Sequence, residues 1–519
     1  MQNESRVKKT FLNIRINMIG YFAAIIISFF TRQIFLDRLG PEFIGLTTTI
    51  NSLLGFLNLA ELGIGTSIAY FLYKPVHDGN RQEIINLISI MGYLYRFIGT
   101  IILSAGVIFS LFLPYIFKET PFSLALIFYC FYAHLASSML GYFVNYRAST
   151  IFGADQRQYL VNGYFQLTQF SQTLIQAACA IYVQSFTLFI TIGLIFSLIN
   201  CWILNWKFHK IYPWIKTNVS DGKILLKEHP EIFKYVKRIF VHNIGGFINT
   251  RVMPLIIYGY GSLTFVTLYG NYTLLNSKIQ GLIGSMMGGS TASVGNLIAE
   301  GNKKRIYDCY KELFSIKFLF VCVALVCLSK LNSPFIAVWL GSKYVLEPIL
   351  VYLIIADFGL NILRDTTNQF LNGYGLYADV WVPIVRVASL GIIVIAASIW
   401  GITGALSIPV IVQIVLMHIW KPYYLYSEGL HQKFSTYFIL VIRNLIPIIA
   451  AAIVANKISQ SIYPLEGQPS TWTQFIKETF SFAIPMAVLA LIFSYICCDG
   501  VRMFARRMKG IMMKRFKNR

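Results

Sequence analysis

Long runs of apolar residues recur from one end of the chain to the other, separated by short polar segments. Each run has about twenty residues or more, enough for a helix to cross roughly 30 Å of hydrocarbon. A backbone inside lipid must satisfy its own hydrogen bonds, and the runs lack the alternation of barrel strands, so we expect helices. The pattern predicts fourteen spans, over residues 11–36, 43–72, 84–116, 122–146, 159–183, 186–206, 239–260, 264–298, 313–329, 348–371, 380–399, 403–420, 435–456 and 479–498.

Composition agrees with an all-α polytopic membrane protein. Of 519 residues, 56% are hydrophobic and 13% are charged, about half the charged share of a soluble protein. The net charge of +22 comes with 44 lysines and arginines, of which 29 fall in the tails and loops on one side of the predicted spans and six on the other. Cytoplasmic loops are enriched in these residues, so we expect both termini in the cytoplasm.

A basic polar segment, about 207–238, lies between spans 6 and 7 and looks like the link between two halves. Weak internal similarity supports this division. Gly79-Asn80-Arg81 recurs as Gly301-Asn302-Lys303, and Gly153 recurs as Gly375, both at an offset of 222. An even number of spans separates the copies, which predicts a parallel repeat of two six-helix bundles. We expect bundles over 1–215 and 216–430, with an added helix pair and a basic tail over 431–519.

Charges inside the predicted spans are mostly positive. A charge near the bilayer centre costs roughly 2.5–3.5 kcal/mol, so such residues line a watery cavity, pair with each other or reach toward the interface. Only three clear acids, Glu61, Asp357 and Asp365, share the spans with nine cations. The cations are Arg15, Arg32, Arg96, Arg251, Lys278, Lys317, Arg364, Arg386 and Arg443.

One-to-one pairing neutralises only three of the nine cations, so an excess remains to attract an anion. Arginine suits phosphate because its planar fork binds two oxygens at once. Lys317 and Arg443 are the members best explained by proximity to a span end. The predicted anion site consists of five other cations, of which Arg251 and Lys278 are the deepest: Arg32, Arg251, Lys278, Arg364 and Arg386.

The three acids have two interpretations. Glu61, Asp357 and Asp365 are candidate sites for a coupling proton or sodium ion, or they are structural partners of basic residues on neighbouring spans. Arg364 and Asp365 are adjacent, and adjacent helical residues point about 100° apart, so at least one needs a partner on another helix. We expect no resident cofactor and no metal site.

Motifs for catalysis are missing from the sequence. It has no GxxxxGK[ST] phosphate loop, no GxSxG and no soluble domain of catalytic size. We therefore expect a transporter and not an enzyme. Nucleic acid is not an expected partner, because no basic soluble domain is present to bind it. Two alternatives stay open: a cation-coupled drug or metabolite antiporter, and a membrane polysaccharide polymerase or ligase.

Several short stretches resemble the polysaccharide and O-antigen flippases of the multidrug/oligosaccharidyl-lipid/polysaccharide exporter superfamily. They are FTRQIFLDRLG at 30–40, FIGL at 43–46, NLAELGIG at 58–65, LYKP at 72–75 and NGYGL at 372–376. The resemblance implies two bundles around a cavity that opens alternately to each side, and an undecaprenyl-pyrophosphate-linked oligosaccharide as cargo for polysaccharide export. The resemblance also implies the inner membrane of a bacterium as the location. We expect a monomer in membrane lipid, with polymerase and export machinery as candidate partners.

Overall fold

The computed structural model describes residues 6–58, 64–287, 290–376, 378–463, 469 and 471–517. In this part of the chain, each of the fourteen predicted spans falls on helices, and there is no strand. Eight helical segments in this part of the chain are long and apolar enough to cross a membrane. The all-α polytopic fold expected from the hydrophobic pattern is therefore confirmed.

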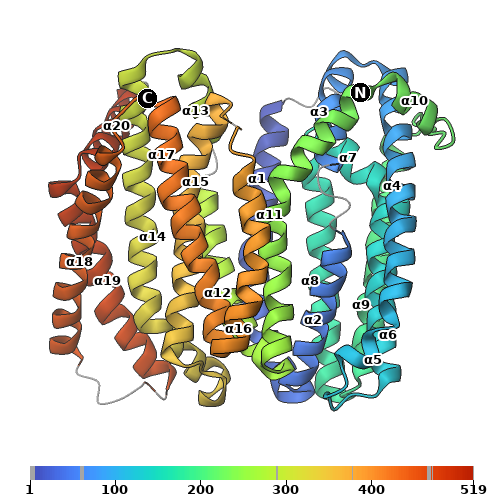
Figure 1. Ribbon diagram of the computed structural model, residues 1–519, viewed down its shortest axis with the longest axis horizontal. Coiled ribbons are helices and arrows are strands. Elements are labelled where there is room, and N and C mark those ends of the chain that lie inside the picture. Colours follow the sequence, from blue (N-terminus) through green and yellow to red (C-terminus); the bar gives the residue numbers. More distant parts are fainter. Residues whose placement is uncertain are drawn as a thin grey trace. The chain divides into compact units, whose positions relative to one another are not determined.

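The helices group into two compact units, residues 1–267 and 268–519. This boundary lies inside α12 (Leu263–Met287), and the three-part division at 215 and 430 stays a prediction. The other helices of the first unit, shown from blue to green in Figure 1, are α1 (Arg6–Leu39), α2 (Pro41–Leu57), α3 (Ile64–Asp78), α4 (Arg81–Ser110), α5 (Leu113–Ile116), α6 (Leu124–Leu140), α7 (Tyr146–Ala154), α8 (Gln158–Tyr182), α9 (Phe186–Ile211), α10 (Gly222–Glu228) and α11 (Pro230–Tyr260).

The second unit repeats the order of the first and then adds helices. The remainder of α12 is followed by α13 (Ser290–Ala299), α14 (Lys303–Leu340), α15 (Pro348–Tyr374), α16 (Trp381–Gln413), α17 (Lys421–Tyr424), α18 (Ser435–Ile462), α19 (Trp472–Cys497) and α20 (Asp499–Lys517). The order of the spans relates helices of the two units. Helix α2 corresponds to α12 and α6 to α15, while α8 and α9 correspond to the two parts of α16 that cover spans 11 and 12.

Twin helix starts confirm one predicted element of the repeat. Gly79 and Gly301 both have positive φ, at 72° and 75°. The residue after each caps the next helix with its side-chain oxygen. Asn80 accepts from the Glu83 amide and Asn302 accepts from the Arg305 amide, both at 3.1 Å. These caps satisfy backbone donors that a helix start leaves free.

The proposed match between Gly153 and Gly375 does not extend to backbone conformation. Gly375 ends α15 in the left-handed region, at φ 70°. Gly153 lies inside α7, and the left-handed residue near that helix end is Gln156, at φ 58°. The chain leaves the two helices differently although the glycines occupy equivalent positions in the sequence.

Helix α14 runs well past the predicted span 313–329 and reaches Leu340. Lys330, one residue beyond the end of that predicted span, therefore lies inside the helix. Its Nζ donates to Oδ1 of Asn456 on α18 at 2.9 Å and lies 4.3 Å from the ring centroid of Phe482 on α19. The added pair α18 and α19, red in Figure 1, packs against α14. The three helices share an apolar core.

Candidate functional site

A polar stripe on α15 forms the base of a site in the second unit. Asp357, Asn361 and Arg364 are spaced four and then three residues apart, which puts them on one face of the helix. The surrounding positions are apolar and include the buried residues Ile355 and Phe358. Helical spacing therefore sets a carboxylate and a guanidinium group along one line.

A glycine turn brings the next two helices to this stripe. Inside α16, Gly401 has φ 59° and ψ −144°, a conformation open mainly to glycine. The turn folds α16 into two arms, which correspond to spans 11 and 12. The arms meet closely, because a Cβ atom on Gly404 would lie 2.2 Å from the backbone oxygen of Ala396. Arg386 stands on the first arm and Gln413 on the second.

Amide groups hold the carboxylate of Asp357. Gln413 donates from Nε2 to Oδ1 at 2.6 Å, and Asn361 donates from Nδ2 to Oδ2 at 3.0 Å. Among the described residues no cation lies within 4 Å of this carboxylate. On the adjoining turn, Nε2 of His418 bonds the backbone oxygen of Leu360 at 3.0 Å. His418 therefore has a packing role, and Asp357 keeps both oxygens occupied without an ion pair.

Two arginines near Asp357 each have a nitrogen without an acceptor. Nε of Arg364 and Nε of Arg386 are buried and have no hydrogen-bond partner among the described residues. Arg386 is only 7% exposed. The two guanidinium groups lie near enough to repel one another, and both are attracted by Asp357. Arg364 is also attracted by Asp365. A buried donor left without an acceptor costs about 1–3 kcal/mol, so this arrangement favours an added anion.

The prediction that Arg364 or its neighbour Asp365 has a partner on another helix is confirmed. Asp365 finds its partner on another helix, since Nζ of Lys317 on α14 lies 3.9 Å from Oδ2 of Asp365. Lys317 is 5% exposed, so it is a buried ion-pair partner, and the expectation that it reaches the interface is wrong. The other cation of that kind, Arg443, binds Asp499 at 2.5 Å and the backbone oxygen of Cys497 at 2.7 Å.

The remaining predicted cations stand elsewhere. In the first unit, Nη2 of Arg32 donates to the backbone oxygen of Thr267 at 3.5 Å. Arg251 on α11 has an exposed side chain that runs along α2, where a Cβ on Gly55 would lie 2.8 Å from its Cδ. Lys278, on α12, is half-buried. Glu61 lies outside the described residues. Only Arg364, Arg386 and Asp357 are thus brought together.

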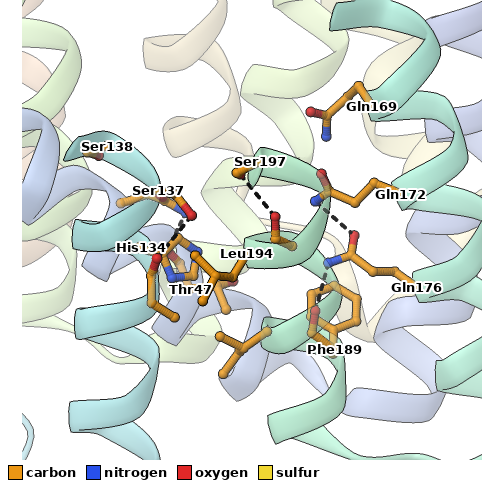
Figure 2. A pocket seen from close by; sticks show the side chains of 14 residues that line it. Thr47, His134, Ser137, Ser138, Gln169, Gln172, Gln176, Phe189, Leu194 and Ser197 are labelled. Carbon is orange, nitrogen blue, oxygen red and sulfur yellow. Dashed lines mark hydrogen bonds between the residues drawn. The ribbon is translucent and has the colours of Figure 1, made fainter. Parts of the chain in front are cut away.

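A cavity of about 450 Å³ occupies the first unit, between α2, α6, α8 and α9. Figure 2 shows glutamine and hydroxyl side chains from these helices facing it. Its lining carries no formal charge. The lining residues are Thr47, Asn51, Ala133, His134, Ser137, Ser138, Gln169, Gln172, Gln176, Phe189, Ile190, Gly193, Leu194 and Ser197.

Sequence reasoning missed both the amide partners of Asp357 and this cavity. A signal for the cavity was available, because Gln166, Gln169, Gln172 and Gln176 recur at spacings of three and four through an apolar span. Such a stripe marks a polar helix face. No equivalent signal pointed to Gln413, since its partner lies 56 residues away. The described residues contain no group of three or more histidine, cysteine or acidic side chains arranged for a metal ion.

Comparison of the sequence with protein families and with curated proteins finds no match. Solved structures do match. The lipid II flippase MurJ, in an inward closed conformation, aligns with a TM-score of 0.60 at 13% identity, over 92% of this chain and 98% of MurJ. An inward-facing multidrug resistance MATE family transporter of the MOP superfamily aligns with a TM-score of 0.55 at 13% identity, over 77% of this chain and 95% of the transporter.

A variant of the Vibrio cholerae MATE transporter VcmN aligns with a TM-score of 0.51 at 14% identity, over 83% of this chain and 98% of VcmN. The chain has the MurJ and MATE fold. At these identities the likeness concerns the fold alone, and the residues of the two sites must be interpreted from their own chemistry.

Proposed function

We propose that this protein is a flippase that carries an undecaprenyl-pyrophosphate-linked oligosaccharide from the cytoplasmic to the outer leaflet of a bacterial inner membrane. In this proposal Arg364 and Arg386 bind the pyrophosphate. The fold shared with the lipid II flippase MurJ supports a transporter of this kind. The observation that carries the proposal is the pair of buried guanidinium groups whose Nε atoms have no acceptor among the described residues.

An anion with several oxygens fits this pair of arginines better than a cationic drug does. Charge-assisted hydrogen bonds to phosphate are about twice as strong as neutral ones. Two guanidinium groups that repel each other gain when an anion lies between them. A cationic drug gains nothing there, because Asp357 is already held by Gln413 and Asn361.

The cargo must also be released, and in this proposal Asp357 promotes release by competing with the pyrophosphate for the arginines. If the carboxylate exchanges its amide donors for Arg364 or Arg386 in another arrangement of the helices, it competes with the pyrophosphate. A competitor that acts in only one arrangement shifts the balance between arrangements. A proton or sodium ion at Asp357, or at Glu61 or Asp365, would couple this exchange to an ion gradient.

The deciding experiment measures binding and export in the same variants. We expect Arg364→Gln and Arg386→Gln each to weaken binding of undecaprenyl pyrophosphate to the purified protein at least about tenfold, because each removes charge-assisted bonds worth about 1.5–3 kcal/mol. The amount of polysaccharide on the surface of the producing cell should fall as binding weakens. The matched control is Arg305→Gln, which removes a guanidinium whose partner is Glu300, at 3.0 Å on the exposed start of α14.

Normal binding and export by the double variant Arg364→Gln, Arg386→Gln, at unchanged membrane levels, would reject this site. Two other results would replace the proposal. Ion-driven uptake of cationic drugs into vesicles would support an antiporter. Glycan transfer in detergent, where there are no two sides to transport between, would support a polymerase or ligase.

Orientation in the membrane is a separate part of the proposal. Reporter fusions at residue 220 and after residue 519 should both give cytoplasmic signals, because 29 of the 44 lysines and arginines lie on that predicted side. An external signal from either fusion would contradict the cytoplasmic placement of the termini.

A further inference from the structure

The cavity of the first unit plays no part in binding a pyrophosphate, because its lining carries no formal charge. Its volume of about 450 Å³ is within the range of roughly 300–1,000 Å³ that is usual for small-molecule sites. Nine of its fourteen lining residues have polar side chains, and four helices contribute them. A lipid chain has no use for so many hydrogen-bonding groups. The occupant they suit is neutral and polar.

The lining offers both donors and acceptors. Gln176 donates from Nε2 to the backbone oxygen of Phe189 at 2.9 Å and accepts from Nε2 of Gln172 at 3.4 Å. These bonds, drawn as dashed lines in Figure 2, fix two amides and leave Oε1 of Gln172 open. The side-chain amide of Gln169 bonds no other described residue, so it has both a donor and an acceptor to offer.

Histidine and serine add acceptors on the facing wall. Nδ1 of His134 lies 2.7 Å from the backbone oxygen of Cys130 and must donate to it, so in the neutral imidazole Nε2 is the acceptor. Ser137 on the same helix donates its hydroxyl to the backbone oxygen of Ala133 at 3.0 Å and keeps its lone pairs open. Figure 2 shows these two side chains opposite Gln172 and Gln176.

We propose that this cavity binds a neutral sugar ring. Each sugar hydroxyl donates one hydrogen bond and accepts others, which matches the mixed set of amide, imidazole and hydroxyl groups around the cavity. The ring of Phe189 and the aliphatic residues Ile190 and Leu194 supply apolar surface for the carbon face of the ring. This assignment rests on the flippase proposed above, whose cargo carries sugar rings of the kind that the cavity would bind.

The test uses the purified full chain and a panel of free neutral sugars, namely glucose, galactose and N-acetylglucosamine. Saturation-transfer NMR detects weak binding of each sugar. Sorbitol, an open-chain polyol, and glucuronate, an anionic sugar, serve as probes that the cavity should bind at least fivefold less well. We expect Gln169→Leu and Ser138→Ala each to weaken sugar binding at least fivefold. Neither side chain bonds another described residue, so both variants should fold.

Two control variants separate this site from the pyrophosphate site. Gln82→Leu makes the same chemical change on the exposed face of α4, where Gln82 bonds Asn86 at 3.0 Å, and should bind sugars normally. Arg386→Gln should lose undecaprenyl pyrophosphate and keep the sugars. If that variant keeps both ligands, the proposed function fails while the sugar site stands. The sugar site itself is overturned if the native protein binds none of the panel, or if Gln169→Leu binds it as the native protein does.

Discussion

The same helices of the repeat carry opposite chemistry in the two units. Helices α2, α6, α8 and α9 surround a neutral cavity of amides and hydroxyls in the first unit. Their counterparts α15 and α16 in the second unit carry Asp357, Arg364 and Arg386. A repeated fold thus fixes where a polar site can form, and the side chains decide what it binds. Fold alone would have assigned the two units the same ligand.

Among the variants that compare the two units, we expect the largest effect on stability and binding from a substitution at the glycine turn in α16. Replacing Gly401 by Ala forces a side chain into φ 59°, ψ −144°, at a cost of about 1–3 kcal/mol, and moves Arg386 relative to Gln413. We expect a lower midpoint of thermal unfolding and weaker binding of undecaprenyl pyrophosphate, with sugar binding in the first unit kept. Gly391→Ala is the matched control, because a Cβ there meets nothing within 4 Å and favours the helix. Equal midpoints of thermal unfolding for Gly401→Ala and Gly391→Ala would contradict the prediction that a side chain at position 401 strains the backbone.

Asp357→Asn tests whether the carboxylate competes with the cargo. Removing this charge leaves Arg364 and Arg386 to the pyrophosphate alone. We expect binding of undecaprenyl pyrophosphate to tighten about tenfold, or about 1.4 kcal/mol, and export to slow because release is harder. Unchanged binding together with full export across a range of external pH and sodium would show that Asp357 is only a structural partner of Gln413 and Asn361.

Substitutions at the two equivalent helix starts, Gly79 and Gly301, should have the smallest effect on stability. The effect should be the same in both units. Gly79→Ala and Gly301→Ala each place a side chain in the left-handed region, at a cost of about 1–2 kcal/mol at most. We expect the two variants to lower the midpoint of thermal unfolding by similar amounts and to leave both ligand sites unchanged. A large difference between them would show that the repeat is similar in conformation and not in energetics.

The sequence predicted the helices well because long apolar runs in lipid have almost no other solution. It also predicted Asn80 and Asn302 as equivalent, since a capping residue acts on its own neighbours. The site was predicted in part. Arg364, Arg386 and Asp357 were expected to be members, but their grouping depends on the Gly401 turn.

Prediction failed where long-range packing decides. Lys317 was expected to reach the interface, but α14 places it against Asp365. Lys330 was expected outside the spans, but it is held by Asn456 and Phe482 of the added pair. Asn456 is 126 residues from Lys330 along the chain, and Asp365 is also far from Lys317, so no local pattern encodes either contact.

The length of chain between α14 and its partners has a consequence for synthesis. Helix α14 ends at Leu340, and α19 begins only at Trp472. At about 5–20 residues per second, α14 waits roughly 7–26 s for α19 to emerge from the ribosome. Until Phe482 has been made, the ammonium of Lys330 lacks the ring whose centroid lies 4.3 Å from it in the folded unit. The contacts that hold Lys330 in α14 therefore form late in synthesis, after α18 and α19 have been made.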